Sequence, residues 1–118
     1  MSKRDWTLLF EDMLESISRI ESYTKDLSFD HFIGNQMVVD AVVRNIEIIG
    51  EASKNVPEDI RAACKDVPWN KLNGIRNRIV HAYFGVDASI IWFIVENELI
   101  SLKKSIQRML ADQGLPRS

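Results

Sequence analysis

The sequence predicts an all-α protein, folded as an antiparallel helical bundle of about four main helices with short helices between them. Apolar residues recur at three- and four-residue steps through every long segment, which is the period of an amphipathic α-helix. No segment alternates apolar and polar residues over enough positions to form a sheet. The connections between the segments are short, and short connections favour antiparallel neighbours.

The first helix is expected from about Asp5 to Lys25, because one apolar stripe runs through that segment. Its members are Trp6, Leu9, Phe10, Met13, Ile17 and Ile20. Ser28 is a suitable N-cap for a short helix in which Phe29 and Phe32 pack inward.

A third helix is expected from about Gln36 to Val56, ending before Pro57. Its apolar residues cover so wide a sector that we expect it to be central and to need cover from a second chain. A polar stripe crosses this background, formed by Asp40, Arg44, Glu47 and Glu51. The stripe fits either a solvated face with intrahelical ion pairs or a helix that partly faces a polar cleft.

The C-terminal half adds three helices to the prediction. Pro57, Glu58 and Asp59 suit the first turn of a short helix, because proline tolerates that position and acids favour it. A fourth main helix is expected from Trp69 or Lys71 to about Ala82. Asp87 is a good N-cap for a last helix that runs to about Ala111, with a frayed tail over residues 112–118.

Composition limits the possible functions. The 118 residues predict a single domain, 1–118, and the single cysteine, Cys64, excludes an intrachain disulfide and fits a cytoplasmic protein. No apolar run reaches the ~18 residues of a membrane span, and no secretory signal is expected. The net charge of −2 and pI of 5.7 argue against a protein that coats nucleic acid, although a local RNA contact stays possible.

Residues 74–85 combine the groups that cleave a phosphodiester through the 2′-hydroxyl of RNA itself. The segment holds Arg76, Asn77, Arg78, His81 and Tyr83. A histidine can accept or donate a proton near neutral pH, and an arginine can bind a phosphate and its developing charge. The same residues could instead be a helix cap, core aromatics and surface ion-pair partners. We expect no metal and no cofactor, since there are too few zinc ligands and no glycine-rich phosphate loop.

The helical period separates two of these groups. At about 100° per residue, Arg76 and His81 lie roughly 140° apart around one helix. A single ideal helix therefore does not direct both side chains at one phosphate. Either the helix unwinds near His81, or two copies of the chain share the site across a two-fold interface.

The spacing of Arg76, His81 and Tyr83 resembles the R-x4-H-x-Y motif of HepT toxins, which belong to the HEPN ribonuclease superfamily. The likeness extends over about 5–111. It includes Asn77 after the arginine and the segments Asp40–Ala52, Pro68–Trp69 and Tyr83–Asp87 with Trp92.

The resemblance implies a HEPN-like homodimer that acts as a metal-independent endoribonuclease, the toxin of a prokaryotic toxin–antitoxin pair. Arg76 would bind the scissile phosphate and His81 would act as general acid or base. Asn77, Arg78, Glu47 and Glu51 would support them.

The implied antitoxin is an MNT-type nucleotidyltransferase that attaches AMP to the motif tyrosine, here Tyr83. Two rival interpretations remain: a non-catalytic dimeric binding module that partners such a transferase, and a purely structural helical dimer.

Overall fold

The computed structural model describes residues 3–84 and 87–112, with side chains over 6–80 and 87–112. Within these ranges every regular element is helical, which confirms the predicted all-α class. The elements are α1 (Lys3–Thr24), α2 (Phe29–Ile33), α3 (Gln36–Lys54), α4 (Glu58–Ala63), α5 (Trp69–Asn73), α6 (Ile75–Phe84), α7 (Ala88–Phe93), the π-helical segment η1 (Ile94–Glu98) and α8 (Leu99–Asp112).

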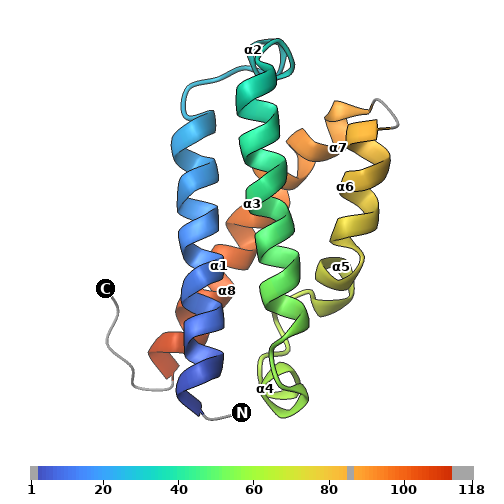
Figure 1. Cartoon of the computed structure of the whole chain (residues 1–118). Coiled ribbons are helices and arrows are strands. Elements are labelled where there is room, and N and C mark those ends of the chain that lie inside the picture. Colours follow the sequence, from blue (N-terminus) through green and yellow to red (C-terminus); the bar gives the residue numbers. More distant parts are fainter. Residues whose placement is uncertain (1–2, 85–86, 113–118) are drawn as a thin grey trace.

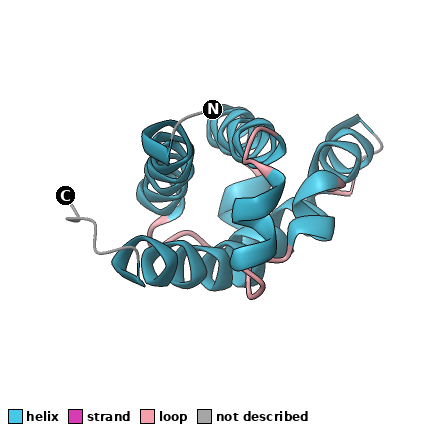
Figure 2. Cartoon of the chain, turned by 90° about the horizontal axis from the view of Figure 1, so that it is seen from below, coloured by secondary structure: helices cyan, strands magenta, loops and turns pink. Residues whose placement is uncertain are grey.

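The long helices form an antiparallel bundle (Figure 1). Helices α1 and α3 lie side by side and run in opposite directions, and α6 packs on α3 and runs back again. Helix α8 crosses behind them and contacts α1, while α2 and α4 lie at opposite ends of α3. Seen from below, the helices surround a common interior (Figure 2).

Apolar side chains from all the long helices fill this interior. Those buried almost completely include Phe10, Met13, Ile17, Ile46, Ile49, Ile75, Ile79, Leu102 and Ile106. The predicted stripe of the first helix is therefore confirmed, apart from the half-buried Leu9. Burial of this kind contributes about 1.5–3 kcal/mol for each large aliphatic or aromatic side chain, so it dominates the stability of the bundle.

Two predicted helix caps are confirmed. The Ser28 side chain accepts a hydrogen bond from the backbone N–H of His31 at 3.2 Å and begins α2. The Asp87 carboxylate accepts one from the N–H of Ser89 at 3.2 Å and begins α7. Both bonds satisfy donors that the first turn of a helix leaves without intrahelical partners.

The prediction of one continuous helix from Trp69 or Lys71 to about Ala82 is wrong, because the helix is interrupted at Gly74. Glycine is a poor helix former, and the Gly74 N–H closes α5 by bonding to the carbonyl of Asn70 at 3.2 Å. Helix α6 then begins at Ile75 in a new direction (Figure 1). The predicted last helix is also not uniform, because its turn over Ile94–Glu98 is π-helical.

A second chain was expected to cover α3 because its apolar sector is wide, and this reason is wrong. The chain itself buries most of the apolar sector of α3, including Val42, Ile46 and Ile49. The exceptions are Met37, with 83% of its surface exposed, and the half-buried Val38, Ala41 and Ile48. None of the described helices is both long and apolar enough to span a membrane.

Gly50 sets the distance between α3 and α6. A Cβ atom at this position would lie 2.7 Å from Cγ2 of Ile75 and 3.5 Å from Cγ of Arg76. Only a residue without a side chain lets the Ile75 side chain come this close to the backbone of α3. The close contact at Gly50 therefore fixes where α6 begins and where Arg76 lies.

Replacing Gly50 with alanine is expected to lower the free energy of unfolding by about 1–3 kcal/mol, because the new methyl group overpacks against buried Ile75. Gly74→Ala is the matched control, since a Cβ there meets nothing closer than 3.7 Å. Urea denaturation followed by circular dichroism measures both variants. Equal stability of the two would show that the contact at Gly50 is not tight.

Candidate active site at the junction of α3 and α6

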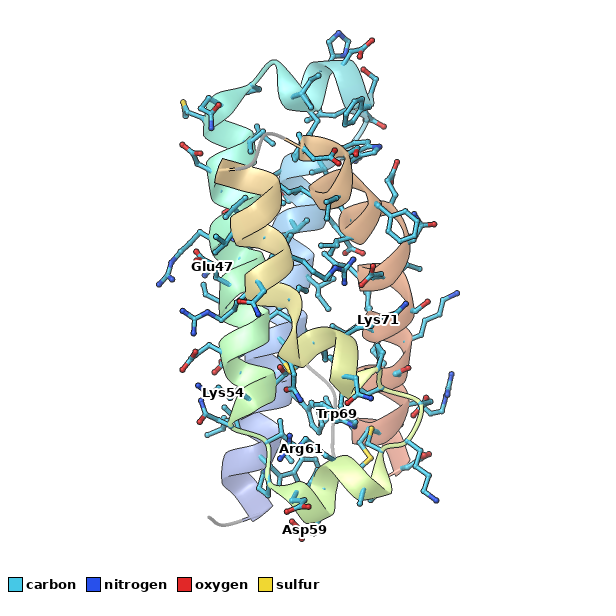
Figure 3. The ribbon with its side chains drawn as sticks, turned by 90° about the vertical axis from the view of Figure 1, so that its right-hand side faces the viewer. Glu47, Lys54, Asp59, Arg61, Trp69 and Lys71 are labelled. Carbon is cyan, nitrogen blue, oxygen red and sulfur yellow. The ribbon has the colours of Figure 1, made fainter. Side chains whose placement is uncertain are left out.

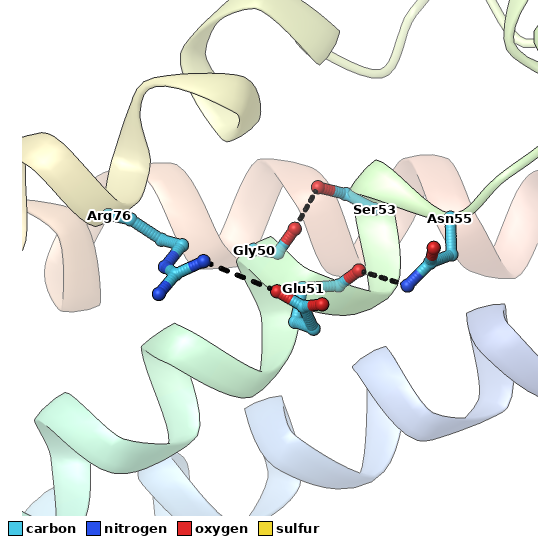
Figure 4. Close-up of polar contacts among 5 residues, drawn as sticks. All are labelled: Gly50, Glu51, Ser53, Asn55 and Arg76. Carbon is cyan, nitrogen blue, oxygen red and sulfur yellow. Dashed lines mark hydrogen bonds and ion pairs between the residues drawn. The ribbon is translucent and has the colours of Figure 1, made fainter.

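Arg76 lies in the first turn of α6, beside the last turns of α3. Its Nη1 donates to Oε2 of Glu51 at 3.4 Å, and 58% of each side chain is exposed (Figure 4). An exposed pair at this distance is weak, since water screens it and both side chains lose freedom in forming it. The guanidinium of Arg76 is therefore held in place without being committed to one partner.

Side-chain hydrogen bonds close the end of α3 that carries Glu51. Ser53 Oγ donates to the carbonyl of Gly50 at 2.8 Å, and Asn55 Nδ2 donates to the carbonyl of Glu51 at 3.0 Å (Figure 4). Carbonyls in the last turn of a helix lack intrahelical donors, so these bonds stabilise the turn.

On one side of Arg76 lies the acidic groove, a hollow of about 390 Å³ between α1 and α3. Its charged lining residues are Asp12, Arg44, Glu47, Glu51 and Arg76. Three of the four residues of the polar stripe line this groove, and two of them, Arg44 and Glu51, are also exposed, so both interpretations of the stripe still fit. The fourth, Asp40, accepts a hydrogen bond from Gln36 instead.

On the other side of Arg76 lies the cationic groove, a hollow of about 580 Å³ formed by α3, α4, α5 and α6. It is lined by Gly50, Lys54, Arg61, Leu72, Asn73, Arg76, Asn77 and Val80. Lys54 and Arg61 lie on the same side of the molecule, below the start of α6 (Figure 3). Arg76 therefore lies where the two grooves meet, and Asn77 lines only the cationic groove.

Arg78 lies apart from both grooves. Its Nη1 and Nη2 donate to the two carboxylate oxygens of Glu98 at 2.9 and 2.6 Å, and 33% and 14% of the two side chains are exposed. The hydrogen bonds from Arg78 lower the pKa of Glu98, the positive charges of Arg78 and Lys71 lower it further, and burial opposes the shift. The supporting role expected of Arg78 would have to compete with this bidentate ion pair, which agrees with the alternative interpretation of Arg78 as an ion-pair partner.

His81 and Tyr83 lie in α6, but their side chains are outside the described residues. The backbone of α6 is helical through Phe84, so the helix does not unwind at His81. In a continuous helix the positions of Arg76 and His81 stay roughly 140° apart about the axis. Unwinding of the helix at His81 is therefore not observed, and a site shared between two chains stays a prediction.

Two further groups bear on the chemistry. Burial is the main cause that raises the pKa of the Cys64 thiol to about 11, helped by the negative charges of Asp66 and Asp112. This thiol therefore stays protonated and is a poor nucleophile at neutral pH. Among the side chains that the structure describes, no three potential metal ligands are grouped together.

Comparison with known proteins identifies the class. The family model for HepT-like ribonucleases matches residues 13–109. The protein named "Putative RNase MJ1380" of Methanocaldococcus jannaschii is 41% identical over 107 residues, which cover 91% of this chain and 98% of that protein. No solved structure gives a significant match.

A second relative agrees with the first. The protein named "Probable ribonuclease HepT" of Thermococcus cleftensis is 37% identical over 107 residues, covering 91% of this chain and 97% of its own length. The chain belongs to the HepT-like ribonuclease family.

Four residues that were not predicted contact the predicted site residues or line a groove beside them. Gly50 had a visible signal, because an isolated glycine inside an apolar helical pattern often marks a close backbone contact. Glu98 had none, since it lies 20 residues from Arg78 and meets it only through the fold. Lys54 and Arg61 look like ordinary surface cations until α3 and α4 are placed around one groove.

Glu98→Gln is expected to lower the free energy of unfolding at pH 7 by about 1–2 kcal/mol, because it removes the charge that two Arg78 hydrogen bonds stabilise. The pKa of Glu98 is lowered in the folded state, so its stabilisation is present above the ordinary carboxyl pKa and is lost as the pH falls through the lowered value. The difference between variant and wild type should therefore shrink in acid.

Glu96→Gln is the control for this variant, because it removes the same charge from an exposed residue two positions earlier. Urea titrations from pH 7 down to pH 3 give the comparison. The same loss in both variants, or a Glu98→Gln deficit that does not change with pH, would contradict the assignment.

Proposed function

We propose that this protein is a metal-independent endoribonuclease and the toxin of a prokaryotic toxin–antitoxin pair. One observation supports the activity above all others. Arg76, the arginine of the family motif, lies at the meeting point of two grooves, more than half exposed and held by one weak ion pair. The relatives' names as RNases agree with that placement.

The proposed reaction uses the 2′-hydroxyl of the RNA as nucleophile. Its oxygen attacks the neighbouring phosphorus while the bond from phosphorus to the 5′-oxygen breaks, giving a 2′,3′-cyclic phosphate and a free 5′-hydroxyl. His81 takes the proton from the 2′-hydroxyl or gives one to the leaving 5′-oxygen. Arg76 binds the scissile phosphate and the charge that builds on it in the transition state.

The remaining site residues support this pair. Asn77 follows Arg76 and lines the cationic groove, where its amide can orient Arg76 or the phosphate. Glu51 positions Arg76 through the 3.4 Å contact, and Glu47 lies in the same acidic groove. These carboxylates repel phosphate, which favours entry of the RNA from the other side of Arg76.

A homodimer would complete the site. Because α6 is continuous, Arg76 of one chain and His81 of a second chain can face one phosphate more readily than the two residues of one chain. A two-fold axis between the α6 helices would form two such sites.

The proposed partner is an MNT-type nucleotidyltransferase acting as antitoxin. It would transfer AMP from ATP to the Tyr83 hydroxyl and release pyrophosphate. Tyr83 follows His81 by two residues in α6. AMP attached to Tyr83 would add bulk and negative charge beside the proposed active site, and both would exclude the RNA backbone.

The purified protein is expected to cleave total RNA or tRNA in EDTA, while Arg76→Ala and His81→Ala lose activity by about 100-fold or more. Termini are checked for 2′,3′-cyclic phosphate, and light scattering shows whether each variant assembles like the wild type. Arg108→Ala is the matched control, because its exposed guanidinium pairs with Asp66 away from both grooves.

Equal cleavage by all four proteins would indicate a contaminant and contradict the proposal. No cleavage by any of them, with Tyr83 unmodified by mass spectrometry, would favour the non-catalytic binding module. Cleavage that stops in EDTA and returns with a divalent metal would refute the metal-independent reaction.

A further inference from the structure

The cationic groove combines three positively charged side chains from three different helices. Lys54 comes from the last turn of α3, Arg61 from α4 and Arg76 from α6. Asn73 and Asn77 add two amides to the lining, and none of the described lining residues is acidic. The acidic groove on the other side of Arg76 has three carboxylates against two guanidinium groups.

Two of these cations have no counter-ion within the part of the chain that the structure describes. Lys54 and Arg61 form no ion pair there, whereas Arg76 reaches Glu51, Arg78 reaches Glu98 and Arg108 reaches Asp66. The Nε of Arg61 is buried and has no hydrogen-bond partner. Like charges that line one groove without a counter-ion repel each other, so the groove suits an anionic ligand.

The fold also holds the groove in shape. The Trp69 indole N–H donates to the carbonyls of Arg61 and Cys64 at 3.1 and 3.0 Å, which ties α4 to α5. The ring of Trp69 packs on Phe10 of α1 with centroids 6.2 Å apart. Gly50 lines the groove as well, and any side chain there would enter the contact with α6.

We infer that the cationic groove binds the RNA backbone beside the scissile phosphate, with Lys54 and Arg61 contacting a neighbouring phosphate. This inference rests on the proposed ribonuclease function and adds a substrate subsite to it. Arg76 lines the same groove, so a strand that contacts Lys54 and Arg61 would extend to the phosphate that Arg76 binds. Lys54 and Arg61 bind and position the strand, whereas Arg76 meets the reacting phosphate.

A chain with a net charge of −2 needs such a local site to attract a polyanion. Each phosphate contact releases counter-ions, so binding should weaken as salt rises. Contacts to phosphate do not read bases, and the subsite should therefore accept single-stranded RNA of any sequence.

The test uses Lys54→Gln and Arg61→Gln, with Lys104→Gln as the matched control. Lys104 is exposed on α8 and does not line the groove. The probe is a fluorescent, single-stranded 2′-O-methyl oligonucleotide of mixed sequence, which cannot be cleaved through its own 2′-oxygen. Fluorescence anisotropy over a series of KCl concentrations gives the Kd and its salt dependence, and thermal melting confirms that each variant is folded.

Each groove variant should raise the Kd roughly fivefold at low salt and lower the slope of log K against log salt by about 0.7. In cleavage assays each should raise KM with little change in kcat, because neither residue meets the scissile phosphate. Lys104→Gln should match the wild type in all these measurements.

Groove variants that bind and melt like Lys104→Gln would overturn the subsite. If His81→Ala still abolished cleavage in that case, the ribonuclease function would stand without the subsite. Failure of the wild type to bind the oligonucleotide at any salt concentration would overturn both. A fall in kcat at unchanged KM would also refute the inference, since it would place Lys54 or Arg61 at the reacting phosphate.

Discussion

The close contact between α3 and α6 at Gly50 is the constraint on which the site depends. Because Gly50 has no side chain, Ile75 can pack directly on the backbone of α3, and Arg76 begins its helix turn beside Glu51. The acidic groove, the cationic groove and the weak ion pair between them all follow from this one approach. Stability and site geometry are therefore linked at a single position.

Charge then divides the surface around Arg76 into two parts. Carboxylates collect on the α1 side, and cations without counter-ions among the described residues collect on the α4 side. Arg76 belongs to both linings, and its 3.4 Å contact with Glu51 is long enough for a phosphate to compete for the guanidinium. The proposed subsite would give a protein with a net charge of −2 a local site that attracts RNA.

Much of the fold could be predicted from the sequence, because helical periodicity is a local property. The stripe from Trp6 to Ile20 and the caps at Ser28 and Asp87 are examples, and the structure confirms them. The break at Gly74 was missed, since an isolated glycine does not reveal whether a helix ends there or continues. The π-helical turn that carries Glu98 had no sequence signal either.

The site could be predicted only in part. Arg76 and Asn77 lie in one helix as expected, and three residues of the polar stripe of α3 line a groove. The pairing of Arg78 with Glu98 and the grouping of Lys54 with Arg61 depend on tertiary packing between distant segments. The proposal of a site shared between two chains rests on the continuity of α6, because a continuous helix separates Arg76 from His81 within one chain.

The most direct test of that claim is complementation between two inactive variants. Arg76→Ala and His81→Ala chains with different affinity tags are refolded together, and the mixed dimer is purified through both tags and assayed for RNA cleavage. A shared site predicts recovered activity, because one of the two sites then receives Arg76 from one chain and His81 from the other. A mixed dimer that forms but stays as inactive as its parents would contradict the account.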